Sequence, residues 1–137
     1  MIEYRNKIPT VDEFNYLNEK VGWGKRSNKV VKEALKNTLS AICVYDNEEI
    51  IGSARIIGDK TIFLYVCDVM VIPEYQGKKI GTEIMNKIVD IINEYKKVNP
   101  NIRAYLGASK GKEDFYKKFG FKTRQEADLG EGMIFFN

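Results

Sequence analysis

The most apolar stretch of the sequence covers residues 62–72 and stops at Pro73. A loop reading PEYQGKKIGTEI follows, and apolar side chains then recur at every fourth position, at Ile80, Ile84, Ile88 and Ile92. This pattern predicts a buried strand, a tight loop and a long helix in direct succession, with the helix ending at Asn99 and Pro100. No other part of the chain constrains the fold as strongly.

The loop is rich in glycine and lysine close to the expected start of the helix near Thr82. Free backbone N–H groups at a helix start, with cationic side chains beside them, favour phosphate binding. A solvated connection has the same composition, so the loop alone leaves both interpretations open. The Walker and GxGxxG phosphate-binding sequences are absent, which argues against nucleoside triphosphates and dinucleotides.

Shorter patterns predict the other elements. A strand is expected at residues 2–5, a helix after the capping box Thr10–Glu13, and a second helix at Val30–Leu39. Alternating apolar residues predict an antiparallel meander over 41–45, 50–58 and 61–72. The later expectations are a strand at 102–109, a short helix at 112–120 and closing strands at 121–124 and 133–136. The order is β, α, α, β, β, β, α, β, α, β, β.

The length of 137 residues predicts a single domain, 1–137, and 44% apolar and 30% charged residues are typical of a globular protein. No stretch predicts a signal peptide or membrane span, so we expect a cytoplasmic protein that does not bind membranes. The net charge of +3 does not indicate nucleic-acid binding, and acidic and basic residues alternate along most of the chain. A monomer or a homodimer is expected.

The sequence contains no histidine, which excludes catalytic triads, Cys-His pairs and metal sites that depend on imidazole. Acid-base chemistry must therefore use carboxylate, phenol, lysine, thiol or water. Cys43 and Cys67 lie in strand-like apolar runs, where a small buried thiol is expected rather than a disulfide, nucleophile or metal ligand. No metal cofactor is expected.

The segments VGWG, DVMVIPEYQGKKIG and ASKGKEDFYKKFGF resemble the GNAT superfamily of acetyl-coenzyme A dependent N-acetyltransferases, in particular small single-domain bacterial members. The family loop R/Q-x-x-G-x-G/A is matched at Gln76 and Gly81, whereas Lys79 replaces the middle glycine. The resemblance covers nearly the whole chain. It implies an α/β (α+β) GNAT fold, with a mixed, mostly antiparallel sheet of six to seven strands flanked by about four helices.

The resemblance also implies where acetyl-coenzyme A binds. Backbone groups of the strand end would hold the pantetheine arm, and the loop would hold the pyrophosphate, mostly through backbone N–H groups. The implied cofactor-binding residues are Val69, Met70, Val71, Gln76, Gly77, Lys78, Lys79, Ile80, Gly81, Thr82, Ser109 and Tyr116. At Lys79, either the backbone keeps negative φ with the side chain turned outward, or the ammonium meets a phosphate.

Two residues are candidates for catalysis. The resemblance implies that Tyr116 faces the coenzyme sulfur, where its hydroxyl could protonate the departing thiolate; the alternative is a core aromatic residue with a solvated hydroxyl. Asp68 is the candidate base, because it is a carboxylate inside an apolar strand, where desolvation could raise its pKa. The alternative is that Asp68 faces away or bonds a nearby backbone N–H. Weaker candidates for the base are Glu33, Tyr65 and Glu74.

The implied function is direct acetyl transfer to a primary amine of a small molecule or peptide. Trp23, in the predicted loop between the first two helices, could contact that substrate or cover the sheet as a hydrophobic plug. The acidic segment EADLGEG could attract a cationic amine or simply be solvated. A catalytically silent module that binds coenzyme A is the alternative function, and nucleic-acid binding through lysines ranks last.

Overall fold

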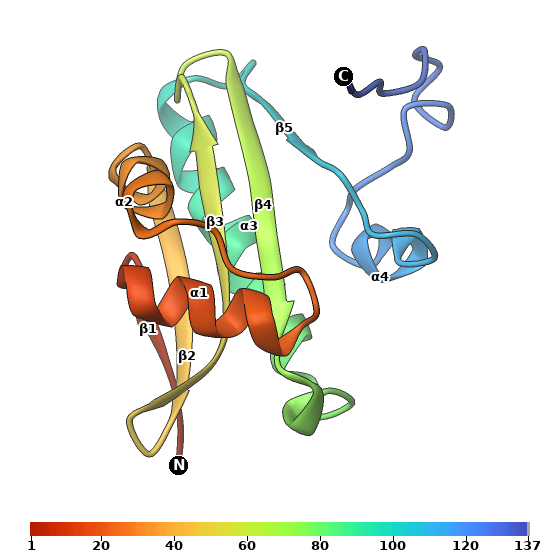
Figure 1. The fold of residues 1–137 in the computed structure, drawn as a ribbon. Helices are drawn as coiled ribbons and strands as arrows, with labels where there is room; N and C mark the ends of the chain where they lie inside the picture. The colour runs from red at the N-terminus through yellow and green to blue at the C-terminus, as the bar shows by residue number, and fades with distance from the viewer. Residues whose placement is uncertain (137) are drawn as a thin grey trace. The chain divides into compact units, whose positions relative to one another are not determined.

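The computed structural model describes residues 1–136 (Figure 1). Its elements in chain order are β1 (Ile2–Asn6), α1 (Val11–Lys20), α2 (Asn28–Lys36), β2 (Ser40–Asp46), β3 (Glu49–Gly58), β4 (Phe63–Val71), the 3-10 turn η1 (Pro73–Tyr75), α3 (Ile80–Val98), β5 (Arg103–Leu106) and α4 (Glu113–Lys117). The packing divides the chain into two compact units, Met1–Leu106 and a second that begins at Gly107. The expected single domain therefore stays a prediction.

All strands of the described chain lie in the first unit, in one sheet with the order β1-β2-β3-β4-β5. Neighbouring strands from β1 to β4 are antiparallel, and β5 runs parallel to β4. The mixed, mostly antiparallel sheet and the four α-helices are as predicted. The expected number of six to seven strands is wrong, because this sheet has five.

The two missing strands were expected at residues 121–124 and 133–136. The first is replaced by a turn, because Thr123 and Glu126 exchange two hydrogen bonds between side chain and backbone, at 2.9 and 3.1 Å. The second segment has no strand partner among the described residues, and its four apolar side chains are exposed. A capping-box pattern and the lack of a neighbouring strand thus outweigh β propensity in this part of the chain.

Helices cover both faces of the sheet in the first unit: α1 and α2 lie over one face, and α3 lies over the other (Figure 1). The apolar stripe of α3 supplies Ile80, Ile84, Ile88 and Ile92 to the core, as its spacing predicts. Alternate residues of the central strands complete this core; Ile56, Leu64 and Val66 are fully buried.

Side-chain caps set the start of the first two helices. Thr10 and Glu13 form the predicted capping box of α1, and the Ser27 hydroxyl accepts the N–H of Val30 at the start of α2. The second helix ends at Lys36 rather than Leu39, because the N–H of Leu39 donates to the Ile56 carbonyl of β3, beside the point where β2 begins. Trp23 lies in the connection between the helices, as predicted.

The backbones of β3 and β4 approach closely at Gly52. A β-carbon at this position would lie 2.8 Å from the carbonyl oxygen of Met70 and 3.4 Å from the Ile84 side chain on α3. Contacts of 2.8 Å to backbone cannot be relieved by rotating a side chain. Glycine is therefore required where β4, β3 and α3 meet.

We expect Gly52→Ala to lower the free energy of unfolding by about 1–3 kcal/mol, the usual effect of overpacking. Chemical denaturation measures the change. Gly130→Ala is the matched control, since a β-carbon there meets no atom within 4 Å. Equal stability of the Gly52→Ala variant and the wild type would contradict this expectation, because it would mean that β3 and β4 can move apart at residue 52 without loss of stability.

Candidate active site

Strand β4 extends beyond the end of its neighbour β5. The two strands pair only from Phe63 to Val66 on β4, opposite Arg103 to Leu106 on β5, whereas β4 continues to Val71. Within the first unit, residues 67–71 of β4 therefore have no strand partner on this side. Backbone N–H and C=O groups on that edge remain open to an extended ligand, which is the position predicted for Val69, Met70 and Val71.

The same half of β4 carries a β-bulge. Ser53 pairs with Met70 and Arg55 pairs with Cys67, so Ala54 alone lies opposite both Asp68 and Val69. Asp68 has a φ of +54°, in the left-handed region that an aspartate seldom occupies. The bulge falls where the unpaired part of β4 begins, and it resets the direction of the backbone groups that follow.

The Asp68 carboxylate is held by Arg55, with 2.6 Å between Nε of Arg55 and Oδ2 of Asp68. Arg55 also donates to the Thr38 hydroxyl at 3.2 Å and to the Ala34 carbonyl at 3.4 Å, both at the end of α2. Both charged side chains are mostly buried, with exposed fractions of 14% and 20%. The candidate base is therefore engaged in a charged contact that sequence reasoning missed. The sequence signal that could have revealed this contact is the single arginine in the apolar run IIGSARIIG.

The loop after β4 is fastened to the strand by Gln76, whose side-chain amide donates to the Val71 carbonyl at 2.9 Å. The chain then passes through Gly77, which has positive φ, and enters α3 at Ile80, two residues before the expected start. Val71 and Gln76, both predicted to hold the cofactor, are thus in direct contact. The Lys78 ammonium lies 5.2 Å from the ring centre of Tyr75.

Lys79 is the N-cap of α3 and has a φ of +63°. Of the two alternatives for Lys79, negative φ is wrong: lysine here adopts the left-handed conformation that suits glycine, the residue usual at this position of the family loop. Its side chain makes no capping hydrogen bond. The N–H groups of Ile80, Gly81 and Thr82 in the first turn consequently have no helical acceptor, which makes this helix start suitable for an anion.

Tyr116 lies on α4 in the second unit and is half-buried. Its ring makes edge contacts with Phe115 and Phe121, at centre distances of 5.1 and 6.4 Å. Burial raises the pKa of its hydroxyl above the ordinary value, so the group stays protonated at neutral pH and can donate. Ser109 is exposed in the same unit, and its carbonyl accepts the N–H of Lys112.

Trp23 is 48% exposed, on a connection that is held at both ends by buried asparagines of α1. The Asn18 carbonyl accepts the N–H of Trp23 at 2.8 Å, and the Asn15 side chain exchanges hydrogen bonds with the backbone of Arg26 at 3.0 and 3.1 Å. This support was not foreseen from the sequence. It presents Trp23 to solvent from a fixed loop, so the hydrophobic-plug interpretation is not favoured.

The weaker candidates for the base are placed less favourably. The Glu74 carboxylate accepts from Lys20 at 2.7 Å, and this hydrogen bond lowers the pKa of Glu74. Glu33 lies on an exposed position of α2, and Tyr65 is 41% exposed on β4. Desolvation by burial raises the pKa of the Cys43 thiol to about 11 and that of Cys67 to about 12, so both remain protonated. Among residues 1–136, no acidic and cysteine side chains cluster to hold a metal.

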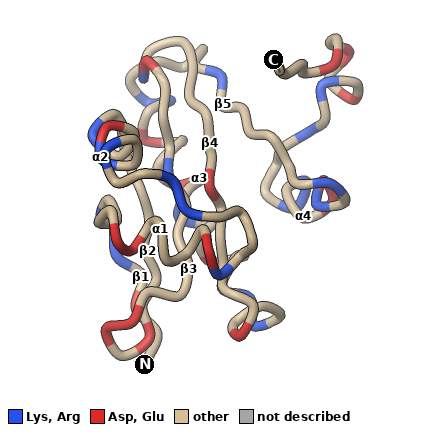
Figure 2. The backbone as a smooth tube through the Cα atoms, in the orientation of Figure 1, with Lys and Arg blue, Asp and Glu red and all other residues tan. Residues whose placement is uncertain are grey.

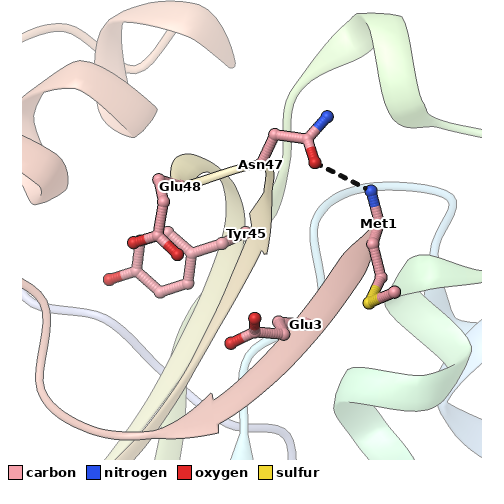
Figure 3. Close-up of a pocket in the computed structure, with 5 residues that line it drawn as sticks. All are labelled: Met1, Glu3, Tyr45, Asn47 and Glu48. Atoms are coloured by element: carbon pink, nitrogen blue, oxygen red, sulfur yellow. Dashed lines mark hydrogen bonds between the residues drawn. The ribbon is translucent and has the colours of Figure 1, made fainter.

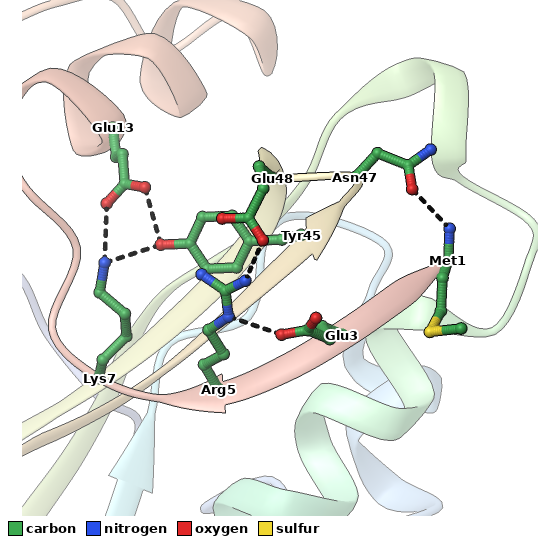
Figure 4. Close-up of polar contacts among 8 residues, drawn as sticks. All are labelled: Met1, Glu3, Arg5, Lys7, Glu13, Tyr45, Asn47 and Glu48. Carbon is green, nitrogen blue, oxygen red and sulfur yellow. Dashed lines mark hydrogen bonds and ion pairs between the residues drawn. The ribbon is translucent and has the colours of Figure 1, made fainter.

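A pocket of about 450 Å³ lies elsewhere, at the ends of β1 and β2 (Figure 3). Its lining residues are Met1, Glu3, Tyr45, Asn47 and Glu48. Polar groups around it bind each other: Arg5 pairs with Glu3 and Glu48, and the Tyr45 hydroxyl donates to Glu13 (Figure 4). These contacts tie the edge strand β1 to β2 and α1. The pocket contains none of the predicted site residues, and we assign it no part in binding the cofactor.

We expect Lys79→Gly to be as stable as the wild type or more so, because it removes a left-handed lysine that costs on the order of 1–2 kcal/mol. Lys79→Val should instead lose about 1 kcal/mol or more, since a β-branched residue tolerates positive φ least. Thermal unfolding of the two variants gives the comparison. A Val variant as stable as the Gly variant would mean that φ at this residue is not positive.

Comparison with known proteins supplies the family. The family model described as "Acetyltransferase (GNAT) domain" matches residues 14–137. An uncharacterized N-acetyltransferase, ycf52-like, from Prochlorococcus marinus is 32% identical over 122 residues, which cover 85% of this chain and 66% of that protein. The similar ycf52 protein of Pyropia yezoensis is 29% identical, over 96% of this chain and 74% of its own. The chain thus spans about two thirds to three quarters of these relatives.

Solved structures agree with this relationship. A Staphylococcus aureus protein described as a probable acetyltransferase superposes with a TM-score of 0.84 at 29% identity, covering 99% of this chain and 100% of that one. A GNAT family acetyltransferase from Streptococcus pneumoniae gives 0.81 at 25% identity, covering 100% of this chain and 98% of that one. The family match, the relatives and the fold lead to one conclusion: this chain belongs to the GNAT superfamily of acetyltransferases.

Proposed function

We propose that this protein transfers the acetyl group of acetyl-coenzyme A directly to a primary amine of a small molecule or a peptide. The observation that carries the proposal is the uncapped start of α3, which follows the unpaired end of β4 after the short loop 72–79. An open strand edge suits an extended amide-bearing arm, and a free helix start suits phosphate. Pantetheine and pyrophosphate are joined in this order in coenzyme A.

The residues present fit this cofactor. The helices α1 and α2 have side-chain caps, whereas the first turn of α3 leaves its N–H groups to a ligand. Gln76 turns its side chain to Val71 rather than toward the helix start. Lys78 and Lys79 add positive charge beside the turn, and the charge of Lys78 contributes to lowering the pKa of Asp46. We assign the pyrophosphate to Gln76–Thr82 and the pantetheine arm to Val69–Val71.

Acetyl-coenzyme A would supply an activated acetyl group as a thioester, whose C–S bond breaks while a C–N bond to the acceptor amine forms. The protein has to orient the two reactants, accept the proton that the ammonium form of the amine loses, and donate a proton to the leaving sulfur. Backbone N–H groups beyond the bulge are the donors available for polarising the thioester carbonyl. The chain needs no histidine for any of these roles.

We assign the proton donor to Tyr116. The raised pKa of its half-buried hydroxyl keeps the proton available over the whole neutral range. The proton acceptor remains a prediction at Asp68, because its carboxylate is already bonded to Arg55. We assign the acceptor amine to the neighbourhood of Trp23, because this aromatic residue is exposed on a supported loop.

The alternative of a catalytically silent module that binds coenzyme A is not favoured. Two features motivate it, the lysine at the middle glycine position of the loop and the lack of an obvious base. The first loses its force, because Lys79 keeps the conformation of a glycine there. Figure 2 shows Lys and Arg positions interspersed with Asp and Glu along much of the chain, which gives no support to the nucleic-acid interpretation. No helix within residues 1–136 is long and apolar enough to cross a membrane. The cytoplasmic location and the monomeric or dimeric state stay predictions.

The proposed function is tested by incubating the purified protein with acetyl-coenzyme A and a panel of amino acids, polyamines, amino sugars and lysine peptides. We expect saturable thiol release, with an acetylated amine identified by mass spectrometry. Binding of coenzyme A without turnover on any amine would favour the silent module. A protein that binds no coenzyme A would refute the assignment of the α3 start.

If Tyr116 is the proton donor, Tyr116→Phe should lower kcat by roughly ten- to ten-thousandfold, the span typical of one acid-base group, with little change in the Kd of coenzyme A. Steady-state kinetics and calorimetry give the two constants. Tyr4→Phe on β1 is the matched control and should retain wild-type kcat. Full activity of Tyr116→Phe would remove this residue from the mechanism.

A further inference from the structure

We propose that Arg55 is a positioning residue, which holds Asp68 in its left-handed conformation and thereby fixes the β4 bulge in the form that binds coenzyme A. This inference deepens the proposed function and rests on it for the identity of the ligand. Two features coincide at Asp68. Its φ is +54° although it is not a glycine, and its carboxylate forms an ion pair of 2.6 Å with Arg55.

The left-handed conformation of Asp68 needs a compensating contact. Aspartate visits this region at a cost, mostly where its short polar side chain finds a local hydrogen bond. The bond found here comes from another strand, since Arg55 lies on β3 and is paired with Cys67, the residue before Asp68. This contact across the bulge adds to a local side-chain hydrogen bond between Cys67 and Asp68.

Arg55 is itself fixed from three sides. Its guanidinium reaches the Thr38 hydroxyl and the Ala34 carbonyl at the end of α2, and it lies 5.6 Å from the ring centre of Phe14 on α1. The planar guanidinium has donors for all of these partners at once, whereas the ammonium of lysine is a compact point charge. The position of the bulge is therefore fixed relative to α1 and α2, the helices that cover this face of the sheet.

The bulge lies at the start of the open edge of β4, so the contact between Arg55 and Asp68 affects that edge. Asp68 immediately precedes Val69, and the open edge of β4 runs from here to Val71, where Gln76 ties the strand to the loop before α3. If residue 68 relaxes to an extended conformation, the side chains and backbone groups beyond it change direction. Arg55 therefore acts on the cofactor through the backbone of β4, without having to touch the cofactor.

The test uses Arg55→Met, Asp68→Gly and the double variant in the full chain. Arg55→Met should weaken binding of coenzyme A roughly tenfold, the order expected when the ligand has to supply the strain of one left-handed residue. Asp68→Gly should bind nearly as the wild type does, because glycine adopts positive φ freely. In the double variant Asp68→Gly should restore most of the affinity that Arg55→Met loses.

Controls separate positioning from general stability. Arg5→Met removes an arginine that is paired with Glu3 and Glu48, away from β4, and should leave the affinity unchanged. If Arg55→Met does not fold, Thr38→Val removes one partner of Arg55 with little change of shape and should give a smaller loss in the same direction. Affinities are measured well below the melting temperature of each variant.

A readout without ligand keeps this inference separate from the proposed function. The three-bond coupling between the amide and α protons of residue 68, measured by NMR, differs between positive φ and an extended backbone. We expect the positive-φ value in the wild type and its loss in Arg55→Met. Retention of that value in Arg55→Met, or wild-type affinity of this variant, would overturn the inference. Failure of the wild type alone to bind coenzyme A would instead overturn the proposed function.

Discussion

The proposed site depends on the loss of one strand pairing. Strand β4 is bonded to β3 over its length, but β5 accompanies it only as far as Val66. Backbone groups in a sheet have to be paired or solvated, and within the first unit residues 67–71 have no strand partner on the side of β5. Because Gln76 bonds to Val71, the loop that follows begins from this open edge, and α3 starts a few residues later.

Electrostatics reinforces this geometry. The start of α3 carries the positive end of a helix dipole, and no side chain from residues 1–136 caps it. Lys79 maintains a turn that glycine would form more easily, and it adds a cation at the same place. The bulge at Asp68 is a second strained point, stabilised by Arg55. One left-handed non-glycine residue, Asp68, therefore directly precedes the residues to which we assign the cofactor, and another, Lys79, lies among them. Strain that the surrounding structure maintains at such positions is common at functional sites.

Much of the fold follows from local patterns. The isoleucine stripe of α3 and the capping box at Thr10 predict their helices, and the strand runs predict β1 to β5 within a few residues. The closing strands do not follow, because the pattern Thr123–Glu126 forms a turn and residues 133–136 find no partner. Strand pairing depends on residues far away in the sequence, which a local pattern does not contain.

Less of the candidate site than of the fold could be predicted from the sequence. The loop residues were identified, but the positive φ of Lys79 and Asp68 depends on backbone geometry, and the substitution of lysine for glycine pointed the other way. Arg55 was overlooked because it is a single charge in an apolar strand, and its partners lie 13 and 17 residues away on β4 and after α2. Such a contact becomes visible only when the strands are paired.

Amide hydrogen exchange with and without coenzyme A, followed by mass spectrometry, measures whether the cofactor lies along the open edge of β4 and at the start of α3. We expect the ligand to slow exchange in two segments, Val69–Val71 on β4 and Ile80–Thr82 at the start of α3. Protection confined to the pocket at the ends of β1 and β2, at Glu3, Asn47 and Glu48, would contradict the assignment of the cofactor to these segments.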